Sequence, residues 1–232
     1  MLSVFLSDTG ITFSQVPALD IKKSRGLIRE KSDKTDAKAI ALYAYRKRGE
    51  LCPTILHSAK VGVLRQLLTL REKLLKHRTA YKITLKDLND CFYEGETQFM
   101  RQTQQNLIKQ LDTELKNVEY KIETMVKSMP AWNINYRLIQ TIKGIGPIIA
   151  MYLMIYTENF SRFTNHKKFA YYAGIAPFEY SSGTSIKSKT RVHPCANKQL
   201  KSLLNLAAMN VITIPGEYKQ YYLRRQQLGK IT

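Results

Sequence analysis

The sequence predicts a mainly α-helical protein with a small α/β part at its N-terminus. Apolar residues recur every three or four positions over long stretches, and strand-like alternation is found near the N-terminus. Hydrophobic residues make up 44% of the 232 residues, which is enough to form a core. We expect three domains: an α/β domain at 1–58, a helical coiled-coil hairpin at 59–130 and a helical C-terminal domain at 131–232.

The N-terminal part combines short predicted strands with one helix. Residues 2–6 are apolar. The next apolar residues alternate with the period of a strand: Ile11, Phe13 and Val16. A helical pattern then runs over residues 37–44, and Ser32 or Asp33 is a suitable N-cap for it.

Two amphipathic helices are predicted in the middle of the chain, joined by a turn at 88–95 into a long hairpin. The apolar stripe of the first consists of Val63, Leu67, Leu70, Leu74, His77 and Tyr81. The stripe of the second is an unbroken a/d seam of Ile108, Leu111, Leu115, Val118, Ile122, Met125 and Met129. Pro130 ends the second helix. Such a seam needs a partner, either the sibling helix or another protomer, so we also expect a homo-oligomer.

The C-terminal part is predicted to contain further helices. An apolar helix runs over residues 148–156, and another lies around residue 170. The segment 174–191 is rich in Gly, Ser and Lys and cannot form a stable helix. The last helix, 197–211, places five apolar residues on one side: Leu200, Leu203, Leu204, Ala207 and Val211.

The charge of the chain indicates a polyanionic partner. Its 37 Lys+Arg and 18 Asp+Glu give a formal charge of +19, and residues 161–232 alone contain 12 basic and 2 acidic side chains. A basic surface can serve solubility alone. Its concentration in the last third of the chain favours a nucleic-acid surface.

The composition indicates a soluble protein of a reducing compartment. The three cysteines, Cys52, Cys91 and Cys195, lie far apart in the sequence without a C-x-x-C pair. The sequence therefore indicates neither a disulfide framework nor a cysteine-based zinc site. The apolar run at 148–156 is about half of a membrane span, and residues 1–6 lack the features of a signal peptide. We therefore expect a cytoplasmic protein without a membrane partner.

Asp33 and Asp36 are candidate metal ligands. They lie three residues apart at a predicted helix start, so both carboxylates project toward the same side. Two convergent carboxylates suit a hard divalent cation, and Mg²⁺ is the usual one where phosphates are the substrate. On spacing alone, the preference of acidic residues for the first turn of a helix is the simpler explanation.

The residues Lys143, Gly144 and Gly146 form a candidate DNA contact between two apolar helices. A G-x-G turn exposes backbone N–H groups beside a helix N-terminus, where a phosphate oxygen fits, as in a helix-hairpin-helix clamp. A tight turn inside a helical bundle also needs glycine. Because Lys143 is present and a basic segment follows, we favour the DNA contact.

A candidate nucleophile lies in the Gly/Ser-rich segment, where Ser181 and Ser182 precede Gly183. Three cations follow it: Lys187, Lys189 and Arg191. Serine attacks a phosphate only when a base or a strong field activates it, and Ser-Gly pairs are far more often flexible turns. His193 is better explained as a structural than as a catalytic residue.

Taken together, the motifs resemble those of the DEDD transposases, bacterial insertion-sequence recombinases related to the Piv-type DNA invertases. The resemblance rests on residues 31–37, 141–147, 172–177 and 181–183, with a coiled middle between the first two. Their order and spacing match over nearly the whole chain.

This resemblance implies a RuvC-like N-terminal domain, a coiled region and a C-terminal transposase domain with a catalytic serine. Members bind Mg²⁺ through four acids and cut and rejoin DNA, and some are guided by a structured RNA. On this chain, Asp33 and Asp36 match the last two acids of the tetrad. Ser182 matches the nucleophile, with Ser181 as the adjacent alternative. The expected partners are therefore DNA, at element ends and target, and a guide RNA.

The N-terminus departs from the family pattern. A RuvC-like domain begins with a strand that carries the first Asp, and a second strand supplies a Glu, but only 32 residues precede Asp33. Asp8 lies too near to Asp33 for the intervening strands and helix. We therefore expect a truncated copy that binds DNA and cleaves it poorly.

The leading functional hypothesis is a DNA transposase that uses Mg²⁺ and a serine nucleophile. The alternative is a non-catalytic DNA- or RNA-binding protein, based on the turn at 144–146 and the basic C-terminal part. A coiled-coil interaction protein, based on the seam at 108–129, leaves the basic C-terminal part unexplained.

Overall fold

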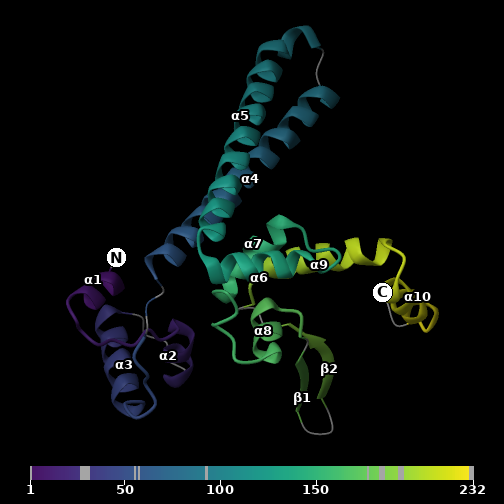
Figure 1. The fold of residues 1–232 in the computed structure, drawn as a ribbon. Helices are drawn as coiled ribbons and strands as arrows, with labels where there is room; N and C mark the ends of the chain where they lie inside the picture. Colours follow the sequence, from purple (N-terminus) through teal and green to yellow (C-terminus); the bar gives the residue numbers. More distant parts are fainter. Residues whose placement is uncertain are drawn as a thin grey trace. The chain divides into compact units, whose positions relative to one another are not determined.

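The computed structural model of the chain describes residues 2–26, 32–54, 56, 58–91, 94–176, 178–182, 186–192 and 196–229. They belong to two compact units, Met1–Ser58 and Ala59–Thr232, whose elements are drawn in Figure 1. Ten helices and two strands lie in the described residues, which confirms the prediction of a mainly α-helical protein. None of these helices is both long and apolar enough to cross a membrane.

The first unit contains three helices, α1 (Leu2–Asp8), α2 (Ala18–Ser24) and α3 (Asp33–Arg46). The predicted N-cap Ser32 is confirmed. Its hydroxyl accepts a hydrogen bond from the Thr35 amide at 3.3 Å, and the Thr35 hydroxyl accepts one from the Ser32 amide at 3.1 Å. This reciprocal capping box satisfies two backbone donors and fixes the start of α3.

The strand predicted at residues 2–6 is wrong, because these residues lie in α1. Residues 11–17 form no strand either, although the Thr54 amide donates to the Phe13 carbonyl at 2.8 Å. A RuvC-like α/β remnant is therefore not seen among the described residues of this unit. A short apolar run is compatible with a strand or a helix, and the helix satisfies its backbone groups without a neighbouring strand.

Helices α4 (Ala59–Cys91) and α5 (Glu94–Lys127) form the long hairpin that the sequence predicts, and they lie side by side in Figure 1. The predicted seam of α5 is confirmed at its centre, where Leu115, Val118 and Ile122 are buried. The sibling helix α4 covers this seam, so the seam has its partner within the chain.

The buried face of α4 differs from the predicted stripe. Val63 and Leu70 are 48% and 44% exposed. The buried residues of α4 are instead Val61, Leu64, Leu68 and Arg71. The Nε of Arg71 donates to Glu119 at 2.7 Å, and its Nη1 donates to the Tyr152 hydroxyl at 3.4 Å. A paired cation thus occupies a core position, and apolar periodicity alone could not identify this face.

Seven further elements follow the helical hairpin in the described residues, and one of them is an apolar helix around which four other helices pack. In chain order the seven are α6 (Pro130–Gln140), α7 (Pro147–Thr157), α8 (His166–Ala173), β1 (Phe178–Ser182), β2 (Ile186–Arg191), α9 (Lys198–Thr213) and α10 (Glu217–Gln227). Eight of the 11 residues of α7 are buried, and α4, α5, α6 and α9 pack against it. The helices predicted over 148–156, around 170 and over 197–211 are thereby confirmed as α7, α8 and α9.

Replacing Glu119 with alanine tests the buried ion pair. Burial alone lowers the pKa of Arg71, but its hydrogen bonds to Tyr152 and Glu119 more than offset this, so the pKa lies above its ordinary value. In Glu119→Ala the guanidinium stays charged and keeps only the Tyr152 hydroxyl. We expect the free energy of unfolding to fall by about 2 kcal/mol, because a largely buried charge loses its counterion. Urea unfolding of the intact chain measures this.

The matched control is Asp112→Ala, about two turns earlier on α5. It breaks the Arg78–Asp112 pair, whose side chains are 31% and 42% exposed. A pair this exposed contributes less than about 1 kcal/mol. Equal losses of unfolding free energy in the two variants would contradict the argument that Arg71 needs its counterion because it is buried.

Candidate nucleic-acid interface and reactive serine

Asp33 and Asp36 both lie in the first turn of α3. The Asp36 carboxylate pairs with the Arg25 guanidinium, which follows the end of α2. A cavity of about 330 Å³ adjoins this pair, and the side chains of Arg25, Lys38 and Arg46 contribute to its lining. Within the part of the chain that the structure describes, no three His, Cys, Asp or Glu side chains form a cluster able to hold a metal ion.

The turn between α6 and α7 has a packed side and an exposed side. Gly144 has φ +85°, and a Cβ there would lie 2.7 Å from the Ala207 carbonyl oxygen and 3.0 Å from Val211 Cγ2, both on α9. Gly146, the N-cap of α7, has φ −86° and no atom within 4 Å of such a Cβ. Lys143 is exposed. Gly144 is thus required for packing, while Lys143 and Gly146 face outward.

The candidate serines and the nearby cations lie in one antiparallel hairpin, β1–β2, so the prediction that 174–191 is not helical is confirmed. The register pairs Ser181 with Lys187 and Ser182 with Ile186. Because strand residues alternate between faces, positions 187 and 189 share the face of 181, and position 182 lies on the opposite one. Three of the residues named from the sequence lie outside the described residues: Gly183, His193 and Cys195.

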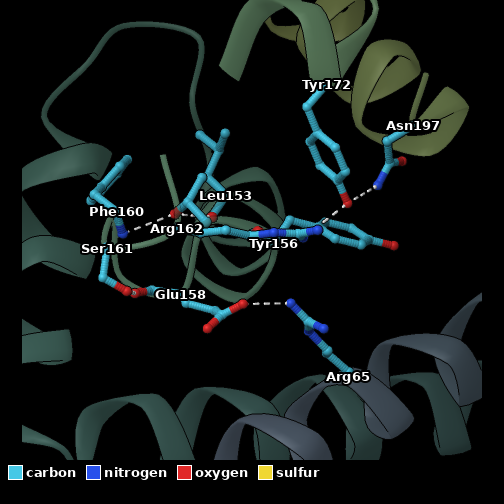
Figure 2. Close-up of polar contacts among 10 residues, drawn as sticks. Arg65, Leu153, Tyr156, Glu158, Phe160, Ser161, Arg162, Tyr172 and Asn197 are labelled. Atoms are coloured by element: carbon cyan, nitrogen blue, oxygen red, sulfur yellow. Dashed lines mark hydrogen bonds and ion pairs between the residues drawn. The ribbon is translucent and has the colours of Figure 1, made fainter. Parts of the chain in front are cut away.

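A polar network at the end of α7, shown in Figure 2, was not predicted. Glu158 pairs with Arg65 of α4 at 2.7 Å. Arg162 donates to the Tyr172 hydroxyl at 3.4 Å, and its guanidinium carbon lies 4.7 Å from the centre of the Tyr172 ring. The Asn197 side-chain amide donates to the same hydroxyl at 3.1 Å. The network joins α4, the loop after α7, α8 and the start of α9.

Burial raises the pKa of Tyr156, beside this network, to about 12. This value includes a smaller upward contribution from the charge of Glu72 and a downward one from a hydrogen bond with Asn197. Burial likewise raises the pKa of Tyr136 to about 12, with a contribution from Glu123. Both hydroxyls therefore stay protonated at neutral pH, which suits a hydrogen-bonding role and not that of an activated nucleophile.

Helix α10 is a further basic element, and it is not among the nucleic-acid contacts predicted from the sequence. It contains Lys219, Arg224 and Arg225, while Tyr218 and Tyr221 are exposed. The Arg224 guanidinium carbon lies 5.6 Å from the centre of the Tyr221 ring. Exposed aromatic rings beside cations suit the stacking of unpaired bases. The available signal was the run of tyrosines and cations at 218–225.

The predicted residues divide between the two units. Asp33 and Asp36 belong to the first, and the turn, the serines and the hairpin cations belong to the second. Within the second unit, α9 is the common support. The turn packs on it at Gly144, and the segment that follows β2 leads into its N-cap, Asn197.

Comparisons with known proteins point to one family. Residues 136–223 match the sequence profile of the transposase IS116/IS110/IS902 family, and residues 1–92 match a DEDD transposase profile of the IS110 type. The pilin gene-inverting proteins of Moraxella lacunata and Moraxella bovis are each 29% identical to the chain over 216 residues. These matches cover 90% of the chain and 62% of each relative, so the chain spans about three fifths of the length of these relatives.

Alanine substitutions at Gly144 and Gly146 test whether one side of the α6–α7 turn is packed and the other exposed. Gly144→Ala forces a side chain into a left-handed conformation and against the α9 backbone, so we expect the free energy of unfolding to fall by about 1–3 kcal/mol. Gly146→Ala meets no atom and keeps an ordinary φ, so we expect a loss below about 1 kcal/mol. Urea unfolding of both variants measures the difference, and a neutral Gly144→Ala would refute the packing role.

Proposed function

Because the chain belongs to the IS116/IS110/IS902 transposase family, we propose that it is a transposase or site-specific DNA recombinase of an insertion sequence. In this proposal it cuts and rejoins DNA at element ends and target. The relatives are named for the inversion of a pilin gene, which is also a rearrangement of DNA. The observation that carries this proposal is the hairpin β1–β2, which holds two serines beside a strand with three cationic positions.

The proposed reaction is serine transesterification. The Ser182 hydroxyl oxygen attacks a DNA phosphorus, the bond from phosphorus to the leaving sugar oxygen breaks, and a protein–DNA phosphodiester forms. The serine proton leaves to a base and the sugar oxygen gains a proton, so the reverse reaction rejoins a strand. Cations of the same hairpin can offset phosphate charge, and positions 187 and 189 lie on the face of Ser181, opposite to that of Ser182. Ser181 is the adjacent alternative.

Asp33 and Asp36 fit Mg²⁺ in the type of their donor atoms, since both supply carboxylate oxygens from one helical turn. In the proposed enzyme these two side chains would hold the ion, which would supply charge stabilisation to a phosphate.

The proposed DNA contacts lie in the second unit. They are Lys143 and Gly146 at the N-terminus of α7, in a turn that Gly144 shapes, and the hairpin residues Lys187, Lys189 and Arg191. The N–H groups at a helix start and the cations both favour phosphate.

The remaining partners follow from exposed surfaces. A structured guide RNA is a further proposed partner, supported by the tyrosines and cations of α10. Exposed apolar side chains on the helical hairpin, Ile83 and Phe99, support a homo-oligomer. The proposed place of action is the cytoplasm of a bacterium or archaeon, where such elements and their DNA reside.

A second candidate is a non-catalytic DNA- or RNA-binding protein. The Arg25–Asp36 ion pair favours it, because a carboxylate engaged by arginine is less available to a metal ion. Salt-dependent binding is common to both candidates. A covalent adduct is expected only of the recombinase.

The salt dependence of DNA binding tests whether the cations of the β1–β2 hairpin contact DNA. The triple variant Lys187→Ala, Lys189→Ala, Arg191→Ala should lower the slope of log K against log salt by up to about 2.7 on duplex DNA, about 0.9 for each lost phosphate contact. A filter or anisotropy titration of the intact chain over a range of salt measures this slope.

The matched control removes the same charge from the exposed face of α5, in the variant Lys109→Ala, Lys116→Ala, Lys121→Ala. Its slope should stay close to that of the unmodified chain. If both triple variants change the slope equally, binding follows net charge and the hairpin is not the contact.

The nucleophile is tested by the covalent adduct on DNA that carries the element ends. Ser182→Ala should abolish a denaturation-resistant protein–DNA band, and Ser181→Ala should leave it, because the register puts the two positions on opposite faces of the hairpin. The reverse result assigns the reaction to Ser181. An unmodified chain that binds DNA without any adduct favours the non-catalytic candidate.

A further inference from the structure

The two ends of the hairpin segment are in direct contact. Gly174, which ends α8, has φ +69°, and a Cβ there would lie 2.7 Å from the Ala196 Cβ and 3.1 Å from Val192 Cγ1. Ala196 and Val192 belong to the segment that returns from β2 to α9. The end of α8 and the segment that leads into α9 therefore contact each other, and we call this contact of Gly174 with Val192 and Ala196 the base of the hairpin.

Asn197 makes two hydrogen bonds across this base and one within α9. Its backbone amide donates to the Tyr172 carbonyl at 2.8 Å, and its side-chain Nδ2 donates to the Tyr172 hydroxyl at 3.1 Å. Its Oδ1 accepts from the Leu200 amide at 2.9 Å and so caps α9. One residue thus sets the start of α9 and ties it to α8.

Tyr172 is held equally firmly on its other side, as Figure 2 shows for Arg162 and Tyr156. Arg162 donates to its hydroxyl and also to the Tyr156 carbonyl, both at 3.4 Å. The rings of Phe163 and Tyr156 lie with their centres 5.2 Å and 6.5 Å from that of Tyr172. The base of the hairpin is therefore anchored to the buried helix α7.

The backbone of the described hairpin residues has no contact with a further helix or strand. Among the described residues, β1 and β2 pair with each other and with no third element. An isolated two-stranded hairpin is only marginally stable in water. The orientation of its residues therefore depends on the contacts at its base.

We propose that Tyr172 and Asn197 are positioning residues that fix the hairpin β1–β2, and with it the reactive serine, relative to α7. The proposal rests on the proposed serine chemistry for its functional consequence. Its structural part, an anchored hairpin base, stands on the contacts alone. A transesterification needs the attacking oxygen in line with the phosphorus, so a hairpin that pivots at its base reacts slowly even where DNA binds normally.

Two substitutions remove the Tyr172–Asn197 side-chain bond, and the one at Tyr172 also removes the hydrogen bond from Arg162. Tyr172→Phe keeps the ring contacts and deletes the hydroxyl. Asn197→Ser keeps a good N-cap for α9 and removes the amide that reaches Tyr172. The matched controls are Tyr120→Phe, at an exposed ring on α5, and Asn165→Ser, at the N-cap of α8, where the side chain accepts from the Lys168 amide.

Amide hydrogen exchange of the intact chain is the first readout. Exchange in 178–182 and 186–192 should rise about 2- to 10-fold in both test variants, as expected for the loss of one hydrogen bond that restrains local opening. Exchange in α4 and α5 and the melting temperature should stay unchanged, and the controls should match the original chain. The effect of the double variant should be smaller than the sum of the single effects, because both variants remove the Tyr172–Asn197 bond, and only Tyr172→Phe also removes the bond from Arg162.

The second readout separates positioning from binding. At saturating DNA the rate of adduct formation should fall in the test variants, while the DNA dissociation constant stays within about twofold, because the cations are retained. Unchanged hairpin exchange in both variants overturns the proposal, and so does a general loss of protection that includes α4 and α5. If hairpin exchange rises but the original chain forms no adduct, the anchored base stands and the proposed serine chemistry fails.

Discussion

Helix α7 is apolar on every side, and the second unit is organised by the need to cover it. Eight of its 11 residues are buried, and four helices pack around it. A helix of this composition has no face suited to water, so its neighbours must approach closely from all directions. The α6–α7 turn illustrates the consequence. It passes so close to α9 that only glycine fits at position 144.

Hydrophobic periodicity predicted those elements whose buried face is wholly apolar. The seam of α5, the apolar α7 and the Leu200–Ala207 face of α9 were all found from the sequence. The face of α4 was not, because Arg71 is buried there through its bonds to Glu119 and Tyr152. The prediction of strands at the N-terminus was wrong for a different reason. Residues 2–6 are too few for their period to distinguish a strand from a helix.

For the candidate site too, the sequence indicated local motifs but not the contacts between distant residues. Motif order located the serines, the glycine turn and the aspartates, because each is a short continuous string. Spacing could not reveal that Gly144 faces α9 or that Asp36 pairs with Arg25. The Tyr172–Asn197 bond spans 25 positions of the chain. Each partner is an ordinary helix residue by itself, and only the fold brings them together.

The turn that follows α7 connects these observations. Glu158, Asn159 and Phe160 have φ of 52°, 57° and 65°, a left-handed run that is costly for residues other than glycine. The contacts of the turn offset this strain. Glu158 pairs with Arg65 of α4, Asn159 accepts from Asn135 of α6 at 2.7 Å, and the Phe160 amide donates to the buried Thr157 hydroxyl.

The direction of the turn explains why such strain is retained. A right-handed continuation would extend α7 along its axis, whereas the left-handed residues turn the chain back, and Arg162 then lies over the Tyr172 ring. Contacts with the helical hairpin and with α6 thus fix the turn, and the turn places the cation that holds Tyr172. In the proposed arrangement the position of β1–β2 therefore depends, through this turn, on the packing of α4 and α6 against α7.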